Sequence, residues 1–396
     1  MAYIWKIDEQ IEAVDDSEGG LTCGVEIEFL VPSIPVTAED PDPEIKNQHL
    51  HRSTSEDDED ISTEIRRQLL KTLQQLTDIP FRAMEEDDFH PPHDNVVIYD
   101  SWRLGQDMSL SSFQFADSPY HWTACELTSS VMDADDYAQQ IQDVCRALKT
   151  TRIYFNRSTA VHVHVGRGNE PFSLNTVKKF ATLYWLTEKA ILKLHHPSRH
   201  NNEHCFRLNH FSALAAKSEG RATMADHVPV VPPSELRYNQ LHRIWGCGSI
   251  EEVARLMEGA KRQEFGYDTT RGSVGFRRFL PAGKTGGNIQ TFEWRQMSSS
   301  ADAKYINQWI KACVAFTDFC RRSSPTTFIE VVGKVVRTGE DYSAIELLEE
   351  LGIDTEIFKE MLQVWTQDPS LSEDYAGRRL LLAIDPEARV YTPTSA

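Results

Sequence analysis

Three short stretches carry charged or imidazole side chains at every second position. In the first, Glu26 and Glu28 alternate with valine, isoleucine and phenylalanine. Side chains two residues apart lie on one face of a β-strand, so both carboxylates face the same way and the apolar residues face the core. Carboxylates about 7 Å apart repel each other unless cations or basic groups share them. The stretch therefore predicts a strand that presents a cation-binding pair.

The other two stretches repeat this arrangement with different groups. His162 and His164 alternate with valines, and Glu293 and Arg295 alternate with two aromatic residues. Each pattern alone has a simpler explanation: an exposed edge strand for the glutamates, a core histidine bonded to a backbone carbonyl, or a surface ion pair. Because the same alternation occurs three times, we favour one shared functional face.

Glu126 is a fourth candidate, because it lies between Cys125 and Leu127 in a predicted strand. If these strands form one curved sheet, its concave face gathers four glutamates, two histidines and an arginine. Oxygen ligands with an imidazole suit Mg²⁺ or Mn²⁺. Two such cations can hold nucleotide phosphates for transfer, and an arginine stabilises the moving phosphoryl group. The pattern predicts an ATP site without a P-loop, since the sequence lacks that motif.

The sequence also predicts the strands and helices that position the candidate site residues. Apolar alternation predicts strands over residues 95–99, 120–131, 160–165 and 288–296. Helical spacing predicts helices that begin near Ser62, Asp133, Ser173 and Ser300. Residues 198–260 read as irregular. The glycine-rich residues 283–287 and an acidic insertion are candidate lid segments.

The acidic insertion covers residues 33–60. Between Glu39 and Asp60 the sequence has nine acidic and two basic residues, with few apolar ones. Such a composition offers little burial to offset the entropy of ordering, so we expect this segment to be flexible.

Composition narrows the class of protein. The chain has 396 residues, 40% of them hydrophobic, so it can bury a large core. Its net charge of -19 argues against general nucleic-acid binding, and no apolar run reaches the ~20 residues of a membrane span. Seven scattered cysteines without a C-x-x-C pair argue against a disulfide framework or a zinc knot. The N-terminus lacks the pattern of a secretion signal, so we expect a soluble, cytoplasmic protein.

The order E-x-E, H-x-H, E-x-R along the chain resembles the carboxylate–amine ligase superfamily of glutamine synthetase and glutamate–cysteine ligase. Residues 24–29, 162–166 and 291–295 are more closely similar to the amidoligase proteins of filamentous fungi. Arg199, Asn202 and Cys205 lie where those proteins tend to carry an Arg/Asn/Cys cluster. The resemblance covers roughly residues 20 to 300.

The resemblance implies an ATP-dependent ligase that phosphorylates a carboxylate to an acyl phosphate, which an amine then attacks. It implies that Glu26, His162 and Glu293 hold one Mg²⁺ and that Glu28 and Glu126 hold the other, with Mn²⁺ as a substitute. It also implies nucleotide or phosphate contacts from four residues: His164, Arg277, Arg278 and Arg295. Among these, Arg295 would stabilise the phosphoryl group.

The expected fold class is α+β. We expect a curved antiparallel sheet with a glutamine-synthetase-like catalytic face, flanked by helices, in residues 1–322. Residues 323–396 are expected to form a helical C-terminal extension with a loose tail. The partners are small molecules, a carboxylic acid and an amine or amino acid; their identity and the oligomeric state stay open.

Three alternatives remain. A single-metal hydrolase or oxygenase could use His162, His164 and one carboxylate, but it would leave the other pairs without a role. A chain of the same fold could bind nucleotides without catalysis. Cys205 could act as a nucleophile, although a buried thiol is the commoner case.

Overall fold

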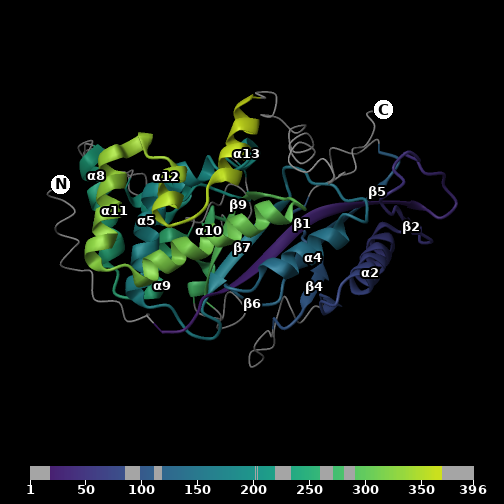
Figure 1. Ribbon diagram of the computed structural model, residues 1–396, viewed down its shortest axis with the longest axis horizontal. Coiled ribbons are helices and arrows are strands. Elements are labelled where there is room, and N and C mark those ends of the chain that lie inside the picture. The colour runs from purple at the N-terminus through teal and green to yellow at the C-terminus, as the bar shows by residue number, and fades with distance from the viewer. Residues whose placement is uncertain are drawn as a thin grey trace. The chain divides into compact units, whose positions relative to one another are not determined.

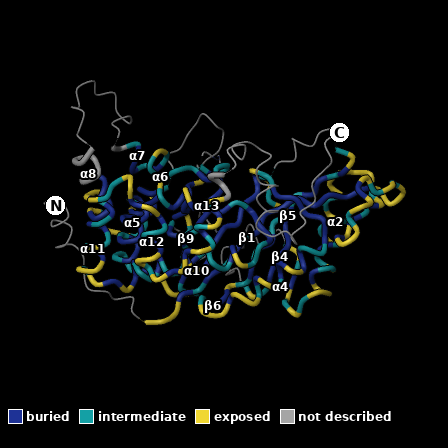
Figure 2. Tube along the Cα trace, turned by 45° about the horizontal axis from the view of Figure 1, so that its top comes forward, coloured by how far each residue is buried: buried dark blue, intermediate teal, exposed yellow. Residues whose placement is uncertain are grey.

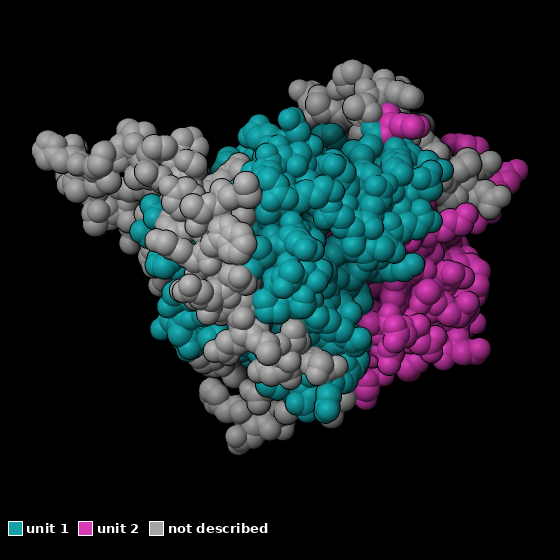
Figure 3. Space-filling model, turned by 60° about the vertical axis from the view of Figure 1, so that its left-hand side comes forward, with its two compact units in different colours: residues 1–22, 164–296, 311–362 teal, residues 23–163, 297–310, 363–396 magenta. Residues whose placement is uncertain are grey.

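The computed structural model describes residues 18–84, 99–110, 118–200, 202, 204–218, 233–258, 271–280 and 290–367 (Figure 1). Residues 95–98 of the predicted strand at 95–99, and the glycine-rich residues 283–287, lie outside this set. The chain forms two compact units, each built from segments that are separate in sequence. Unit 1 comprises residues 1–22, 164–296 and 311–362, and unit 2 comprises residues 23–163, 297–310 and 363–396 (Figure 3).

The described strands follow the order β3-β4-β5-β1-β7-β9-β8, and β2 and β6 both pair with β1. They are β1 (Thr22–Pro35), β2 (His51–Ser53), β3 (Phe81–Ala83), β4 (Trp102–Gly105), β5 (His121–Thr128), β6 (Met132–Asp133), β7 (Ala160–Gly166), β8 (Val274–Gly275) and β9 (Thr291–Ser298). The α+β class is confirmed, and buried residues follow the strands (Figure 2).

The sheet is mixed, whereas the sequence predicted an antiparallel one. β5 runs antiparallel to both β1 and β4, but β2 runs parallel to β1 and β3 runs parallel to β4. Parallel neighbours need a long connection to return the chain to the same end. Residues 36–50 separate β1 from β2, and residues 84–101 separate β3 from β4, so both pairs have enough chain between them. The sequence of these segments did not indicate whether the strands they join would run parallel or antiparallel.

In unit 2, helix α2 (Asp58–Leu76) begins earlier than predicted. Asp57, not Ser62, is the N-cap, and its side chain accepts a hydrogen bond from the Glu59 amide. The acidic run thus lies at the positive end of a helix, where negative charge is stabilising. Ile65, Leu69 and Leu73 are buried as expected, whereas Leu76 is 45% exposed.

Two further features of unit 2 differ in detail from the predictions. Helix α4 (Ala138–Leu148) begins after Tyr137 rather than at Asp133. Within residues 33–60, Asp40 forms a two-pronged ion pair with the buried Arg152, at 2.8 and 2.6 Å. This pair anchors part of the acidic segment to the core.

Unit 1 contains the predicted long helix α5 (Leu174–Leu192), which Ser173 caps as expected by accepting from the Thr176 amide. Phe180 on α5 stacks on Phe292 of β9 with ring centroids 3.6 Å apart, and Trp294 and Phe316 pack edge-on against Phe180. These rings form a core against the apolar side of β9, so the alternate side chains of that strand, Glu293 and Arg295, take the opposite side.

Residues 198–260, predicted to be irregular, contain four helices among the described residues. They are α6 (Leu208–Phe211), α7 (Ala213–Ser218), α8 (Pro233–Gly246) and α9 (Ile250–Met257). Short 3-10 turns occur at η2 (Pro197–Arg199), η4 (Arg277–Phe279) and η6 (Gly339–Asp341). Helix α9 is capped by Ser249, which accepts from the Glu252 amide.

The last described part of the chain is helical. It comprises α10 (Ala303–Arg322), α11 (Pro325–Thr338), α12 (Ala344–Glu350) and α13 (Glu356–Gln367). α10 begins three residues after Ser300, whose hydroxyl accepts from the Asp302 amide. The proposed domain boundary after residue 322 stays a prediction. Within the described ranges, no helix is long and apolar enough to cross a membrane.

Candidate functional site

The acidic side chains of unit 2 lie in register across neighbouring strands. Glu28 on β1 pairs directly with Glu126 on β5, and Glu26 pairs with Thr128. Residues directly opposite each other in antiparallel strands share a face. The two β1 glutamates therefore share their face of the sheet with a third carboxylate, that of Glu126 on β5.

A fourth carboxylate joins this group from the loop after β4. Asp107, Glu28 and Glu126 each offer an oxygen, and these oxygens lie within 4.8 Å of one another. Carboxylates this close repel each other unless a proton or a cation is shared. Their oxygens match the ligands that Mg²⁺ and Mn²⁺ prefer, so the three residues fit a divalent cation.

Glu126 shows the electrostatic strain of this arrangement. Burial raises the pKa of its carboxyl well above the ordinary value, and the charges of Glu26, Glu28 and Asp107 raise this pKa further. A hydrogen bond from the Thr128 hydroxyl, at 3.0 Å, acts in the opposite direction. A cation in this position would remove the repulsion.

His162 lies between the two glutamates of β1. Its Nδ1 is 2.8 Å from Glu26 Oε2, and its Nε2 is 3.6 Å from Glu28 Oε1. The ring is 1% exposed. Because an ionised carboxylate only accepts hydrogen bonds, Nδ1 carries the proton and donates to Glu26. Glu28 is held from a second direction, since its Oε2 accepts from the Ala160 amide at 2.7 Å.

In unit 1, Arg295 is the centre of a buried hydrogen-bond group. Its guanidinium pairs with Glu293 and donates from Nε to the His204 carbonyl at 3.1 Å. Its own carbonyl accepts from the buried Arg199 at 2.7 Å. Burial and these bonds leave Arg295 little rotational freedom. A fixed guanidinium is well suited to bind a developing negative charge.

The other candidate residues of unit 1 differ in their burial and hydrogen bonding. Asn202 Oδ1 accepts a hydrogen bond from the His204 amide at 2.8 Å. This bond shapes the turn whose His204 carbonyl accepts from Arg295. Cys205 is completely buried, and burial raises the pKa of its thiol, which does not favour a nucleophile. Arg277 is exposed on η4, and Arg278 beside it is half-buried.

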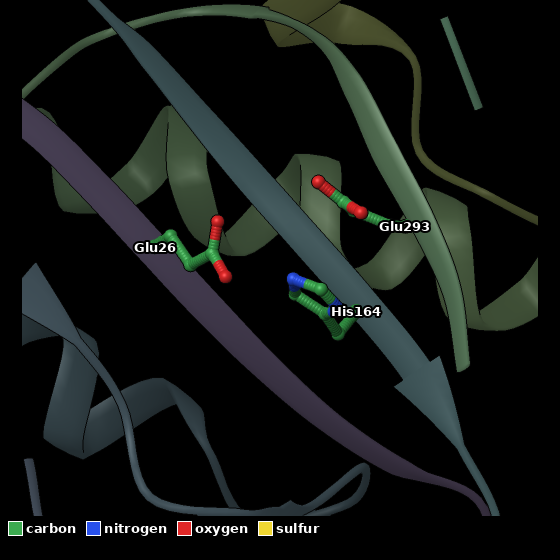
Figure 4. A group of neighbouring side chains, drawn as sticks. All are labelled: Glu26, His164 and Glu293. Carbon is green, nitrogen blue, oxygen red and sulfur yellow. The ribbon is translucent and has the colours of Figure 1, made fainter. Parts of the chain in front are cut away.

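His164 follows His162 on the same face of β7. It is half-buried, and its Nδ1 lies 3.1 Å from the Thr291 hydroxyl on β9. Figure 4 shows the side chains of Glu26, His164 and Glu293, which come from β1, β7 and β9. All three are of the types that bind metal ions.

The predicted site residues are divided between the two units. Unit 2 holds Glu26, Glu28, Glu126 and His162, and unit 1 holds His164, Arg277, Arg278, Glu293 and Arg295. Two residues escaped the sequence analysis. Asp107 lies in a loop without periodicity, and Glu258 ends a helix in a region read as irregular. Nothing local distinguishes either from a surface acid.

One family model matches the part of the chain that carries the β1, β5 and β7 groups. The model of a family described as "Putative amidoligase enzyme" matches residues 20–228, just over half of the 396 residues. The matched range includes β1, β5 and β7 with their glutamates and histidines. Among curated proteins, no match is found. The chain therefore belongs to this amidoligase family.

Proposed function

We propose that this protein is an ATP-dependent ligase that joins a carboxylic acid to an amine through an acyl phosphate. The observation that carries the proposal is the group of Glu28, Asp107 and Glu126 carboxylate oxygens within 4.8 Å of one another. Membership of an amidoligase family supports amide formation as the reaction.

The chemistry explains why such a group is needed. A carboxylate is a poor electrophile, and its condensation with an amine in water is unfavourable without activation. Bound Mg²⁺ would supply charge neutralisation at the nucleotide phosphates. Glu28, Asp107 and Glu126 would hold one cation through oxygen atoms alone. The assignment of Glu26, His162 and Glu293 to the other cation stays a prediction.

Arg295 is the proposed phosphoryl-stabilising residue. Its hydrogen bonds to Glu293 and to the His204 carbonyl orient the guanidinium before any substrate binds. Preorganised charge of this kind lowers a barrier without further rearrangement. We propose His164 for the nucleotide side, with Arg277 and Arg278 as additional phosphate contacts.

The proposed substrates are a small carboxylic acid and an amine or amino acid. The function is tested by incubating the protein with Mg·ATP, a panel of acetate, hexanoate, benzoate and glutamate, and hydroxylamine as the trapping amine. Acid-dependent release of ADP together with a hydroxamate is the expected result. Glu126→Gln and Arg295→Ala should lose both products, whereas Glu251→Gln, a surface change on α9, should keep them.

The alternatives give different results in the same experiment. A nucleotide-binding protein without catalysis would bind Mg·ATP and release no ADP. A single-metal hydrolase or oxygenase would neither bind nor consume ATP and would purify with zinc or iron instead. Either outcome would overturn the ligase proposal.

A further inference from the structure

Glu188 on α5 is a completely buried carboxylate that accepts hydrogen bonds from two distant segments of unit 1. Its Oε1 accepts from the Leu208 amide at 2.5 Å and from the Ser273 hydroxyl. Its Oε2 accepts from the Asn209 amide at 2.8 Å. Burial raises the pKa of the carboxyl, whereas the bonds from Ser273, Asn209 and Leu208 lower it. The three donors therefore offset the cost of burying this group.

Each of these two segments also carries a carbonyl that binds Arg295. The Ser273 carbonyl accepts from the Arg295 amide at 3.0 Å. The His204 carbonyl, four residues before Leu208, accepts from Arg295 Nε at 3.1 Å. One buried carboxylate thus holds the support of the Arg295 backbone and the support of its guanidinium.

Backbone hydrogen bonds join the two segments to each other. The Ser273 amide donates to the Phe206 carbonyl at 2.7 Å, and the Phe206 amide donates to the Arg271 carbonyl at 3.0 Å. Residues 204–209 and 271–273 thus form one hydrogen-bonded platform. The buried carboxylate on α5 anchors this platform to the long helix of unit 1.

A chain of buried side chains links the same carboxylate to β9 by a second route. Gln296, the residue after Arg295, donates from Nε2 to the Tyr184 hydroxyl at 2.6 Å. Tyr184 donates to the Ser273 hydroxyl at 2.7 Å, and Ser273 donates to Glu188. Each hydroxyl accepts one bond and donates one, so the chain requires an acceptor at its end. Glu188 provides that acceptor.

We propose that Glu188 is a positioning residue for the ligase reaction: by anchoring the platform, it holds the Arg295 guanidinium where the phosphoryl group is transferred. The proposal rests on the ligase function proposed above and on Arg295 as its phosphoryl-stabilising residue. Glu188 acts through Arg295 and touches no substrate itself.

Electrostatic catalysis depends on this kind of support, because a fixed charge stabilises the transition state without rearrangement. A displacement of about 1 Å caused by a distant change can cost about 10²-fold in rate. Glu188→Gln has nearly the shape of the native side chain but replaces one oxygen with an NH₂ group. That group faces the N–H or O–H donors of the platform and cannot accept from them. The substitution therefore disturbs the anchor while keeping the packing.

The test is a double-mutant cycle with Arg295→Lys, measured as hydroxamate formation with Mg·ATP, the acid panel and hydroxylamine. Glu188→Gln alone should lower kcat by about 10²-fold and leave the KM for Mg·ATP unchanged. In the Arg295→Lys background the same change should have much less effect, because the guanidinium that it positions is absent.

Thr187→Val is the matched control. Thr187 is equally buried on α5, but its hydroxyl donates at 2.8 Å to the Leu183 carbonyl of the same helix. This variant should lose stability in urea unfolding and keep the wild-type kcat. If Glu188→Gln does not fold, Ser273→Ala decides: it removes one bond to the carboxylate, keeps the carbonyl that binds Arg295, and should show the same pattern with a smaller fall in kcat.

Three results would overturn the inference while wild type is active. They are a wild-type kcat in folded Glu188→Gln, an equal fall in both backgrounds of the cycle, and an equal fall in Thr187→Val. The first would show that the anchor does not affect catalysis, the second that Glu188 acts independently of Arg295, and the third that any loss of stability lowers the rate. If wild type forms no hydroxamate with any acid, the ligase function itself fails and this role fails with it.

Discussion

Glu28 on β1 and Glu126 on β5 lie directly opposite each other in antiparallel register. Like charges in this arrangement destabilise a sheet, and here Asp107 adds a third carboxylate. The repulsion among these carboxylates must be offset by a shared proton or cation. We propose that a bound cation offsets it. The relationship leads to the first prediction.

Glu126→Gln should stabilise the metal-free protein and remove its response to Mg²⁺. The raised pKa of Glu126 means that the folded protein binds this proton more tightly than the unfolded chain. The stability of metal-free wild type should therefore fall as pH rises from the ordinary glutamate range through the raised pKa. At saturating Mg²⁺, about 100 times its Kd, wild type should gain ~2.7 kcal/mol.

Thermal unfolding in EDTA and in Mg²⁺ measures both effects. The variant should melt at a higher temperature than wild type in EDTA near neutral pH and should show no Mg²⁺ shift. Glu251→Gln is the control. An unchanged Mg²⁺ shift in Glu126→Gln would argue against a cation at this group.

His162→Ala should destabilise the protein more than His164→Ala. His162 is buried and donates from Nδ1 to Glu26 at 2.8 Å, so its removal leaves a cavity and a carboxylate without this donor, at a cost of roughly 2–5 kcal/mol. His164 is half-buried and is bonded to a hydroxyl group, so its loss should cost about 1 kcal/mol. Urea unfolding of the two variants gives the comparison. Equal costs would mean that the His162 contacts contribute little.

Arg295→Lys should fold but lose most of the proposed activity. Lysine keeps the charge, but it cannot donate to Glu293 and the His204 carbonyl from one planar group. We expect kcat for hydroxamate formation to fall by about 10²–10³-fold. Arg255→Lys, in an exposed pair with Glu251 on α9, is the matched control. Full activity in Arg295→Lys would exclude a role for the guanidinium geometry.

The protein should lose stability in mild acid partly through His51. This ring is fully buried, and burial followed by the charge of His49 lowers its pKa from 6.5 to about 4. Between these values the unfolded chain takes up a proton that the folded protein does not, so stability is complete above about pH 6.5 and falls as pH drops to about 4.

Chemical denaturation at several pH values in this window measures the slope. His51→Gln should reduce the acid loss by an amount on the order of 3 kcal/mol, because it removes a shift of this size from the linkage. His196, whose pKa burial also lowers to about 4, should retain its own share. An unchanged slope would mean that the His51 ring protonates in the folded state as it does in the unfolded chain.

Much of the site was predictable because strand periodicity is a local property. Glu26 and Glu28 share a face of β1, and His162 and His164 share a face of β7, whatever the rest of the chain does. Alternation with apolar residues also located β1, β7 and β9, and the cap at Ser173 follows from its own neighbours.

Only the tertiary structure decided which strands meet and in what register. A shift of one residue would turn Glu126 away from Glu28, and no local pattern in β5 sets that register. The same holds for the parallel pairing of β2 with β1, for Asp107 in its loop, and for the bond that brings Glu258 to Phe276. The sequence alone determined which groups each strand presents; the packing of distant segments decided which of them stand together, because pairing energy depends on partners far along the chain.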